Sequence, residues 1–168
     1  MSHRQVLRRL LRSRCIDESG IDLQRGLLYG EALALASNIV LAEIKSLPRS
    51  APRTQAVAGG VEAVPLLAGI VMRAAQWQMA PMEACAIRAQ AKGHGSKERI
   101  DNEPAVCSDI VLVAGIMTES VTIYVEALTE RGHRCVGVVA LIQAARDFAV
   151  ISPDSAPIRS VYWIDDLL

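Results

Sequence analysis

Aromatic residues are scarce in this 168-residue chain. Two tryptophans, three tyrosines and one phenylalanine make up 4% of it, yet 51% of its residues are apolar. A core built on stacked rings is therefore excluded, and we predict one made of Ala, Val, Leu and Ile. The length suits one domain. We predict a single domain over residues 1–168, with residues 1–50 as a divergent helical N-terminal part.

Net charge is also absent, because 18 basic residues balance 18 acidic ones. No strong field would draw nucleic acid or a membrane surface, so we expect neither as a partner. No apolar run reaches the roughly 18 residues that a membrane span needs. The basic N-terminus, residues 1–14, lacks the uninterrupted apolar centre of a secretory signal and reads as an amphipathic helix with solvated charges. We expect a cytoplasmic protein.

The four cysteines are widely spaced and form no C-x-x-C pair. They are Cys15, Cys85, Cys107 and Cys135. Such spacing favours buried, reduced thiols over disulfides or metal ligands, and we predict no metal site in the chain itself.

Helical and strand-like segments alternate along the chain. We predict helices at 30–46, 61–75 and 120–130, and strands at 54–58, 83–89, 109–113, 135–142 and 159–164. This alternation indicates an α/β fold with a mainly parallel sheet flanked by helices. Ligands bind such sheets outside the carboxyl ends of the strands. The loops expected there are residues 58–62, 114–122 and 143–147.

The segment 109–122 joins a buried strand to a helix through a short polar turn. Thr118, Ser120 and Thr122 supply hydroxyls at the start of that helix, which is a layout that holds phosphate groups. The segment resembles the phosphoribosyl-pyrophosphate (PRPP) motif of type I phosphoribosyltransferases, in which a strand ends in two acidic residues before a Thr/Gly/Ser loop. In this chain, Ala114 and Gly115 occupy the two positions of that acidic pair.

A second segment, 88–95, resembles the catalytic loop of orotate phosphoribosyltransferases, Arg-Lys-x-x-Lys-x-His-Gly. Arg88, Lys92 and His94 match it as candidate catalytic residues, while Ala89 replaces one lysine. A mobile cationic loop can close over a pyrophosphate leaving group and stabilise its charge. The alternative is that these residues form a solvated basic loop without a catalytic role. In either case, we predict that residues 90–103 are mobile or contact a neighbouring subunit.

Two further matches involve candidate substrate-binding residues. Residues 58–65 resemble the family's Gly-Pro-x-x-x-Gly-x-Pro loop, with Glu62 where the family has a lysine. Arg146 follows the strand at 136–142, where the family's arginine grips the pyrimidine. An arginine paired with Asp147, or simply solvated, is the alternative.

The departures from the family all lie at the PRPP site. Glu62 and Glu119 bring negative charge to loops that should receive phosphates, and Ala114 and Gly115 offer no oxygen to the ribose hydroxyls. A like-charge contact at ~4 Å costs roughly 4 kcal/mol at an effective dielectric constant of about 20. Thr118, Glu119, Ser120 and Thr122 are thus candidate phosphate-binding residues in an impaired site.

The resemblance implies a nucleotide or nucleoside-like small-molecule ligand in pyrimidine metabolism, with Mg²⁺ needed only if PRPP is bound. It also implies a homodimer, because the family's loop reaches over the partner's active site. A mixed dimer with an active phosphoribosyltransferase follows the same logic. RNA-binding regulation is a third function of some relatives, and the neutral net charge argues against it. Two functions stay open besides. One is a non-catalytic partner or regulator. The other is an active transferase of the glycosyltransferase class, or an enzyme with altered chemistry on a ribosylated or other substrate.

Overall fold

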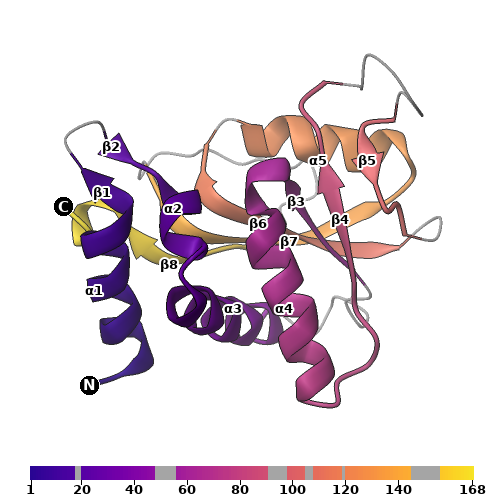
Figure 1. Cartoon of the computed structure of the whole chain (residues 1–168). Coiled ribbons are helices and arrows are strands. Elements are labelled where there is room, and N and C mark those ends of the chain that lie inside the picture. Colours follow the sequence, from indigo (N-terminus) through magenta and orange to yellow (C-terminus); the bar gives the residue numbers. More distant parts are fainter. Residues whose placement is uncertain (18–19, 48–55, 91–97, 105–107, 119, 145–155) are drawn as a thin grey trace.

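A six-stranded sheet forms the centre of the computed structural model (Figure 1). The structure describes residues 1–17, 20–47, 56–90, 98–104, 108–118, 120–144 and 156–168. The strands are β3 (Ala56–Gly60), β4 (Glu83–Ile87), β5 (Ile100–Asp101), β6 (Asp109–Met117), β7 (Arg134–Gln143) and β8 (Ile158–Trp163). Their order is β5-β4-β3-β6-β7-β8, and every pairing is parallel except that of β4 with β5. The predicted mainly parallel sheet with an internal strand at 109–113 is confirmed.

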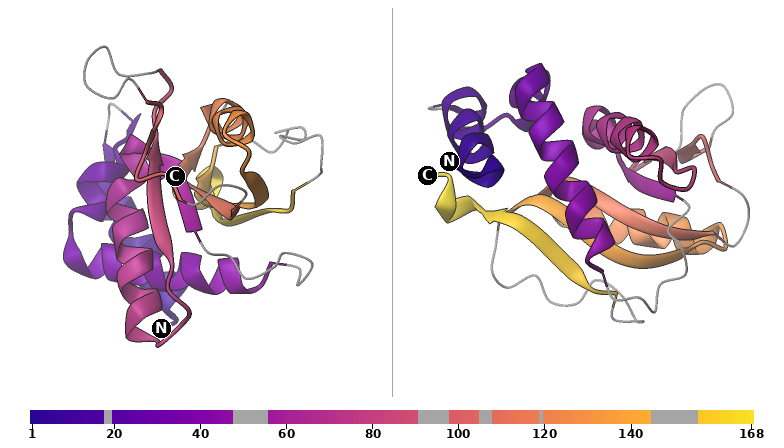
Figure 2. Two further views of the ribbon diagram at one scale, coloured as in Figure 1. Left: turned by 90° about the vertical axis from the view of Figure 1, so that its right-hand side faces the viewer. Right: turned by 90° about the horizontal axis from the view of Figure 1, so that it is seen from below.

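Helices cover both faces of this sheet. They are α1 (His3–Cys15), α2 (Leu23–Leu27), α3 (Gly30–Lys45), α4 (Val64–Gln76) and α5 (Ser120–Glu130), with a short hairpin of β1 (Ile16–Asp17) and β2 (Gly20–Ile21) between α1 and α2. Helices α1, α3 and α4 lie on one side of the sheet (Figure 2), and α5 packs on the other. The predicted helix at 30–46 corresponds to α3, and the predicted helix at 120–130 matches α5.

Strand β6 shows why its apolar sequence suits the centre of the sheet. Val111 and Val113 point into the core beneath α3 and α4, whereas Ile110 and Leu112 point into the core beneath α5. All four are at most 1% exposed. A strand buried on both faces needs a continuous apolar run rather than an alternating one.

Several predicted boundaries differ from the structure. Residues 100–101, within the predicted loop at 90–103, form β5 because they pair with β4. Gly59 and Gly60 lie in the loop that we predict at 58–62, but in the structure they complete β3. A Cβ on Gly59 would lie 2.5 Å from the carbonyl oxygen of Val113, so the close approach of β6 requires glycine there. Strand β6 also continues through residues 114–117, predicted as loop, because Ile116 and Met117 keep their register with β7.

The N-terminal helix is anchored to the C-terminal end of the chain. Leu7 and Leu11 are fully buried on the predicted apolar face of α1. Its basic face is not simply solvated, because Arg8 Nε donates to the carbonyl of Asp166 at 2.6 Å and Arg12 donates to that of Leu168 at 2.9 Å. These contacts position the hairpin and α2 above the sheet.

Three of the four cysteines agree with the prediction for thiols. Cys15, Cys85 and Cys135 are buried and free, and burial raises the pKa of Cys85 to about 12. Cys107 lies outside the described residues. Among the described helices, none combines the length and apolar character required to cross a membrane.

Candidate functional site

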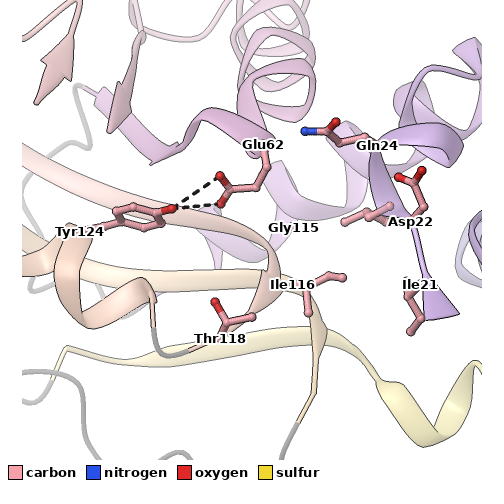
Figure 3. Close-up of a pocket in the computed structure, with 9 residues that line it drawn as sticks. Ile21, Asp22, Gln24, Glu62, Gly115, Ile116, Thr118 and Tyr124 are labelled. Carbon is pink, nitrogen blue, oxygen red and sulfur yellow. Dashed lines mark hydrogen bonds between the residues drawn. The ribbon is translucent and has the colours of Figure 1, made fainter. Parts of the chain in front are cut away.

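A cavity of about 470 Å³ opens at the carboxyl end of β6 (Figure 3). Its wall combines the end of this strand with the turn after β3, the start of α5 and the segment that enters α2. The lining residues are Ile21, Asp22, Leu23, Gln24, Glu62, Gly115, Ile116, Thr118 and Tyr124. Ligands of parallel α/β sheets bind at this edge, so the cavity is the candidate site.

Glu62 places a carboxylate inside this cavity. It lies in the 3₁₀ turn Val61–Ala63 that directly follows β3, and its carboxylate occupies the space that a Cβ on Gly60 would need. The hydroxyl of Tyr124 donates to both carboxylate oxygens, at 3.4 and 3.5 Å (Figure 3). Burial and the nearby charge of Glu62 raise the pKa of Tyr124, so its hydroxyl remains protonated as a donor.

Gly115 brings the N-terminal segment close to the strand end. A Cβ at this position would lie 2.8 Å from Cδ2 of Leu23, the first residue of α2. Leu23 is held there because Asp22 caps α2 by accepting a hydrogen bond from the backbone N–H of Arg25 at 3.1 Å. The Leu23 side chain therefore occupies the space that a larger side chain at position 115 would need to reach into the cavity.

Ala114 faces the opposite side of the sheet. It is 6% exposed and packs in the core beneath α5. The two positions that correspond to the family's acidic pair are thus separated by the strand's alternation, and only Gly115 lines the cavity.

The described lining is acidic. Asp22 and Glu62 are its charged members, and the described wall contains no Lys, Arg or His. Gln24, Thr118 and Tyr124 add neutral polar groups, while Ile21, Leu23 and Ile116 add apolar surface. Both charges of the described lining are negative, so its local field favours hydrogen-bond donors and positive charge over anions.

The structure brings together two of the residues predicted from the sequence, Glu62 and Thr118. Arg88 follows β4 and donates to Asp101 next to it from Nε at 3.1 Å and from Nη2 at 2.8 Å. It therefore braces the β4–β5 pair and is not part of the cavity wall. Thr122 is exposed on α5 and is not part of the wall either.

The side chains of the remaining predicted site residues lie outside the described part of the structure. Ser120 begins α5, as predicted, but its side chain is outside the described part of the structure. Also outside the described residues are Lys92, His94, Glu119 and Arg146.

Sequence reasoning missed the wall contributed by Asp22, Leu23 and Gln24, and also Tyr124. One signal was available for the first group, since an Asp directly before a helical segment is a common N-cap. Nothing local relates Tyr124 to Glu62, because the two residues are 62 positions apart in the chain.

Comparison with known proteins identifies the architecture. No protein-family model matches the chain, and no curated protein matches it in sequence. Solved structures do match: a phosphoribosyltransferase from Corynebacterium diphtheriae has a TM-score of 0.80 at 22% identity over 99% of both chains. The chain has the fold of the type I phosphoribosyltransferases.

Orotate phosphoribosyltransferases give the same result. The Mycobacterium tuberculosis enzyme in complex with PRPP has a TM-score of 0.73 at 21% identity over 99% of both chains. The enzyme from Aeropyrum pernix has a TM-score of 0.68 at 20% identity, covering 99% of this chain and 96% of its own. The resemblance predicted from the sequence is thus confirmed for the fold.

Proposed function

We propose that residues 1–168 form one cytoplasmic, orotate phosphoribosyltransferase-like domain with an impaired PRPP site, which serves as a non-catalytic partner or regulator in nucleotide or nucleoside metabolism. The observation that carries this proposal is the composition of the cavity. Glu62 projects into it, and Leu23 sits against Gly115 where an acidic side chain would be needed. A solved phosphoribosyltransferase of similar structure is in complex with PRPP. This similarity supports PRPP as the ligand that the cavity is impaired in binding.

The energetic argument concerns both charge and hydrogen bonding. One like-charge contact at ~4 Å costs roughly 4 kcal/mol at an effective dielectric constant of about 20, which is close to a 1000-fold loss of affinity. Gly115 cannot accept a hydrogen bond through a side chain, and each missing charged hydrogen bond costs roughly 1.5–3 kcal/mol. Together these terms exceed what the Thr118 hydroxyl can offset.

Magnesium enters this proposal only with PRPP. Among the described residues, no group of three or more His, Cys, Asp or Glu side chains could hold a metal ion. The donor set that the structure describes at the cavity therefore does not fit a resident metal ion.

Calorimetry with magnesium and PRPP tests the proposal directly. We expect no saturable binding to the wild-type chain at micromolar PRPP, and no orotate-dependent release of pyrophosphate. An active orotate phosphoribosyltransferase measured in the same buffer is the positive control. Micromolar affinity for PRPP in the wild-type chain would show that the site is not impaired.

The exposed face of α4 supports dimerisation. Val64, Ala68, Met72 and Ala75 follow one another at helical spacing and are all exposed, with Met72 at 64%. An uncharged apolar stripe suits the self-complementary contact of a two-fold homodimer. We extend the proposal to a mixed dimer with an active phosphoribosyltransferase, tested by co-expression and co-purification with differently tagged chains.

An enzyme with altered chemistry is the second candidate. The cavity stays open at about 470 Å³ and retains Gln24, Thr118 and Tyr124 as polar groups. A nucleoside that raises the melting temperature in the absence of PRPP would favour this candidate over a purely non-catalytic partner.

A further inference from the structure

We infer that the cavity at the end of β6 binds a small organic cation, a protonated amine or quaternary ammonium attached to an apolar group. The inference rests on the proposed function in one respect, namely that the site does not take PRPP. It assigns the class of ligand that the same walls would accept.

Charge is the first argument. Glu62 forms no ion pair with any described residue, and its described polar partner is the neutral Tyr124 hydroxyl. Those O···O distances of 3.4 and 3.5 Å are long for O–H···O bonds, which cluster near 2.7–2.8 Å. The carboxylate therefore keeps most of its charge and hydrogen-bonding capacity for a ligand.

The shape and polarity of the wall are the second argument. Ile21, Leu23 and Ile116 give the cavity an apolar side, and the Tyr124 ring comes from α5 next to Glu62 (Figure 3). An ammonium group beside the carboxylate gains the ionic interaction and can donate a hydrogen bond to the Tyr124 hydroxyl oxygen, which faces the carboxylate (Figure 3). A volume of about 470 Å³ lies within the range of small-molecule pockets.

Other ligand classes fit less well. Phosphates and carboxylates would meet Glu62 and Asp22 without a compensating base in the described wall. A divalent metal ion requires about six oxygen ligands, yet one Asp22 oxygen already caps α2. An organic cation needs only the one carboxylate and the apolar surface beside it.

Three fragments of similar size test the inference: benzylamine, benzyl alcohol and benzoate. Each is titrated into the ¹⁵N-labelled full chain, with Glu62→Gln as the test variant and Glu126→Gln as the control. Glu126 is exposed on α5, is not part of the cavity wall, and its substitution changes net charge equally. The readout is the dissociation constant from shifts of the Gly115 and Tyr124 amides.

We expect benzylamine to bind the wild-type chain at least tenfold more tightly than benzyl alcohol, with benzoate the weakest. Glu62→Gln should bring the dissociation constants of benzylamine and benzyl alcohol within about twofold of each other, whereas Glu126→Gln should preserve their tenfold ratio. Equal binding of the amine and the alcohol, stronger binding of benzoate, or an unchanged ratio in Glu62→Gln would overturn the inference. Parallel titration with magnesium–PRPP separates the two proposals, because PRPP binding contradicts the impaired site whichever fragment binds.

Discussion

The side chain of Leu23 lies against Gly115, with its Cδ2 only 2.8 Å from where a Cβ on the glycine would be. The two residues come from α2 and from the carboxyl end of β6. Their contact closes the N-terminal segment onto the sheet and forms part of the cavity wall. An acidic residue at position 115 therefore requires the Leu23 side chain to move or to be replaced.

The Leu23–Gly115 contact should appear as a coupling free energy. Gly115→Ala alone should destabilise the fold by about 1–3 kcal/mol through overpacking, and Leu23→Ala alone by about 2–4 kcal/mol because it removes a buried side chain. The double variant should cost at least about 0.5 kcal/mol less than the sum. Urea denaturation measures all three. Gly30→Ala is the control, since a Cβ there meets nothing within 4 Å; its effect should add to that of Leu23→Ala, and strict additivity at position 115 would contradict the contact.

PRPP binding should be restorable by reversing the departures at the cavity. Glu62→Lys removes the repulsion between the carboxylate and the PRPP phosphates. Gly115→Asp supplies a hydrogen-bond acceptor for the ribose hydroxyls, and Leu23→Ala makes space for its side chain. Glu119→Thr completes the series, whereas Ala114 is left unchanged because it is buried beneath α5. Calorimetry with magnesium–PRPP should show affinity rising at each step, with the full set the tightest. Glu126→Lys controls for net charge and should leave binding absent; an equal gain from it would remove the role assigned to Glu62.

A charge on α4 should break the predicted dimer. Met72 is 64% exposed on the apolar stripe, and Met72→Glu would place two like charges at a self-complementary contact. We expect sedimentation velocity to show a dimer for the wild-type chain and a monomer for the variant at micromolar concentration. Leu28→Glu is the matched control, because Leu28 is 77% exposed but lies outside α4. A monomeric wild-type chain would refute the dimer and the loop contributed in trans.

Stability should fall at alkaline pH partly through Tyr162. Burial raises the pKa of Tyr162 from an ordinary value of 10.0 to about 12, and its hydroxyl donates to the carbonyl of Arg4 at 2.6 Å. The unfolded chain therefore loses this proton first, so the contribution is complete below pH 10 and is lost as pH rises towards 12. Urea melts across this range should show a shallower decline for Tyr162→Phe. Some slope will remain because the pKa of Cys85 is also raised to about 12.

The control for this prediction is Tyr29→Phe, since Tyr29 is 41% exposed. It should leave the decline with pH unchanged. Equal slopes for the wild-type chain and Tyr162→Phe would mean that the buried hydroxyl does not contribute to alkaline unfolding.

Local patterns in the sequence were sufficient for most elements of the fold. The apolar run of residues 110–113 predicted a strand buried on both faces, and the polar turn after it predicted the start of α5 at Ser120. The helix predicted at 30–46 is α3, which ends at Lys45. These features depend on side-chain polarity and backbone preference within a few residues, so they can be read from the chain.

The limits of that reading appear where strands meet. Gly59 and Gly60 look like a turn in isolation, yet their pairing with Ala86 and Ile87 of β4 keeps them in β3. Residues 114–117 look like a loop, yet their register with β7 makes them strand. Hydrogen bonds between strands far apart in sequence decided both, and local preference gave no sign of them.

The candidate site divides in the same way. Its two predicted members in the cavity wall, Glu62 and Thr118, follow strands directly, so the parallel topology alone was enough to place them at the same edge. Leu23 and Tyr124 reach that edge only because α1 and α2 dock over the sheet and α5 packs beneath it. The sequence determined where the cavity would open, since strand ends follow from local patterns. The packing of distant helices decided what lines it, because side-chain contacts between segments nearly a hundred residues apart exist only in the folded chain.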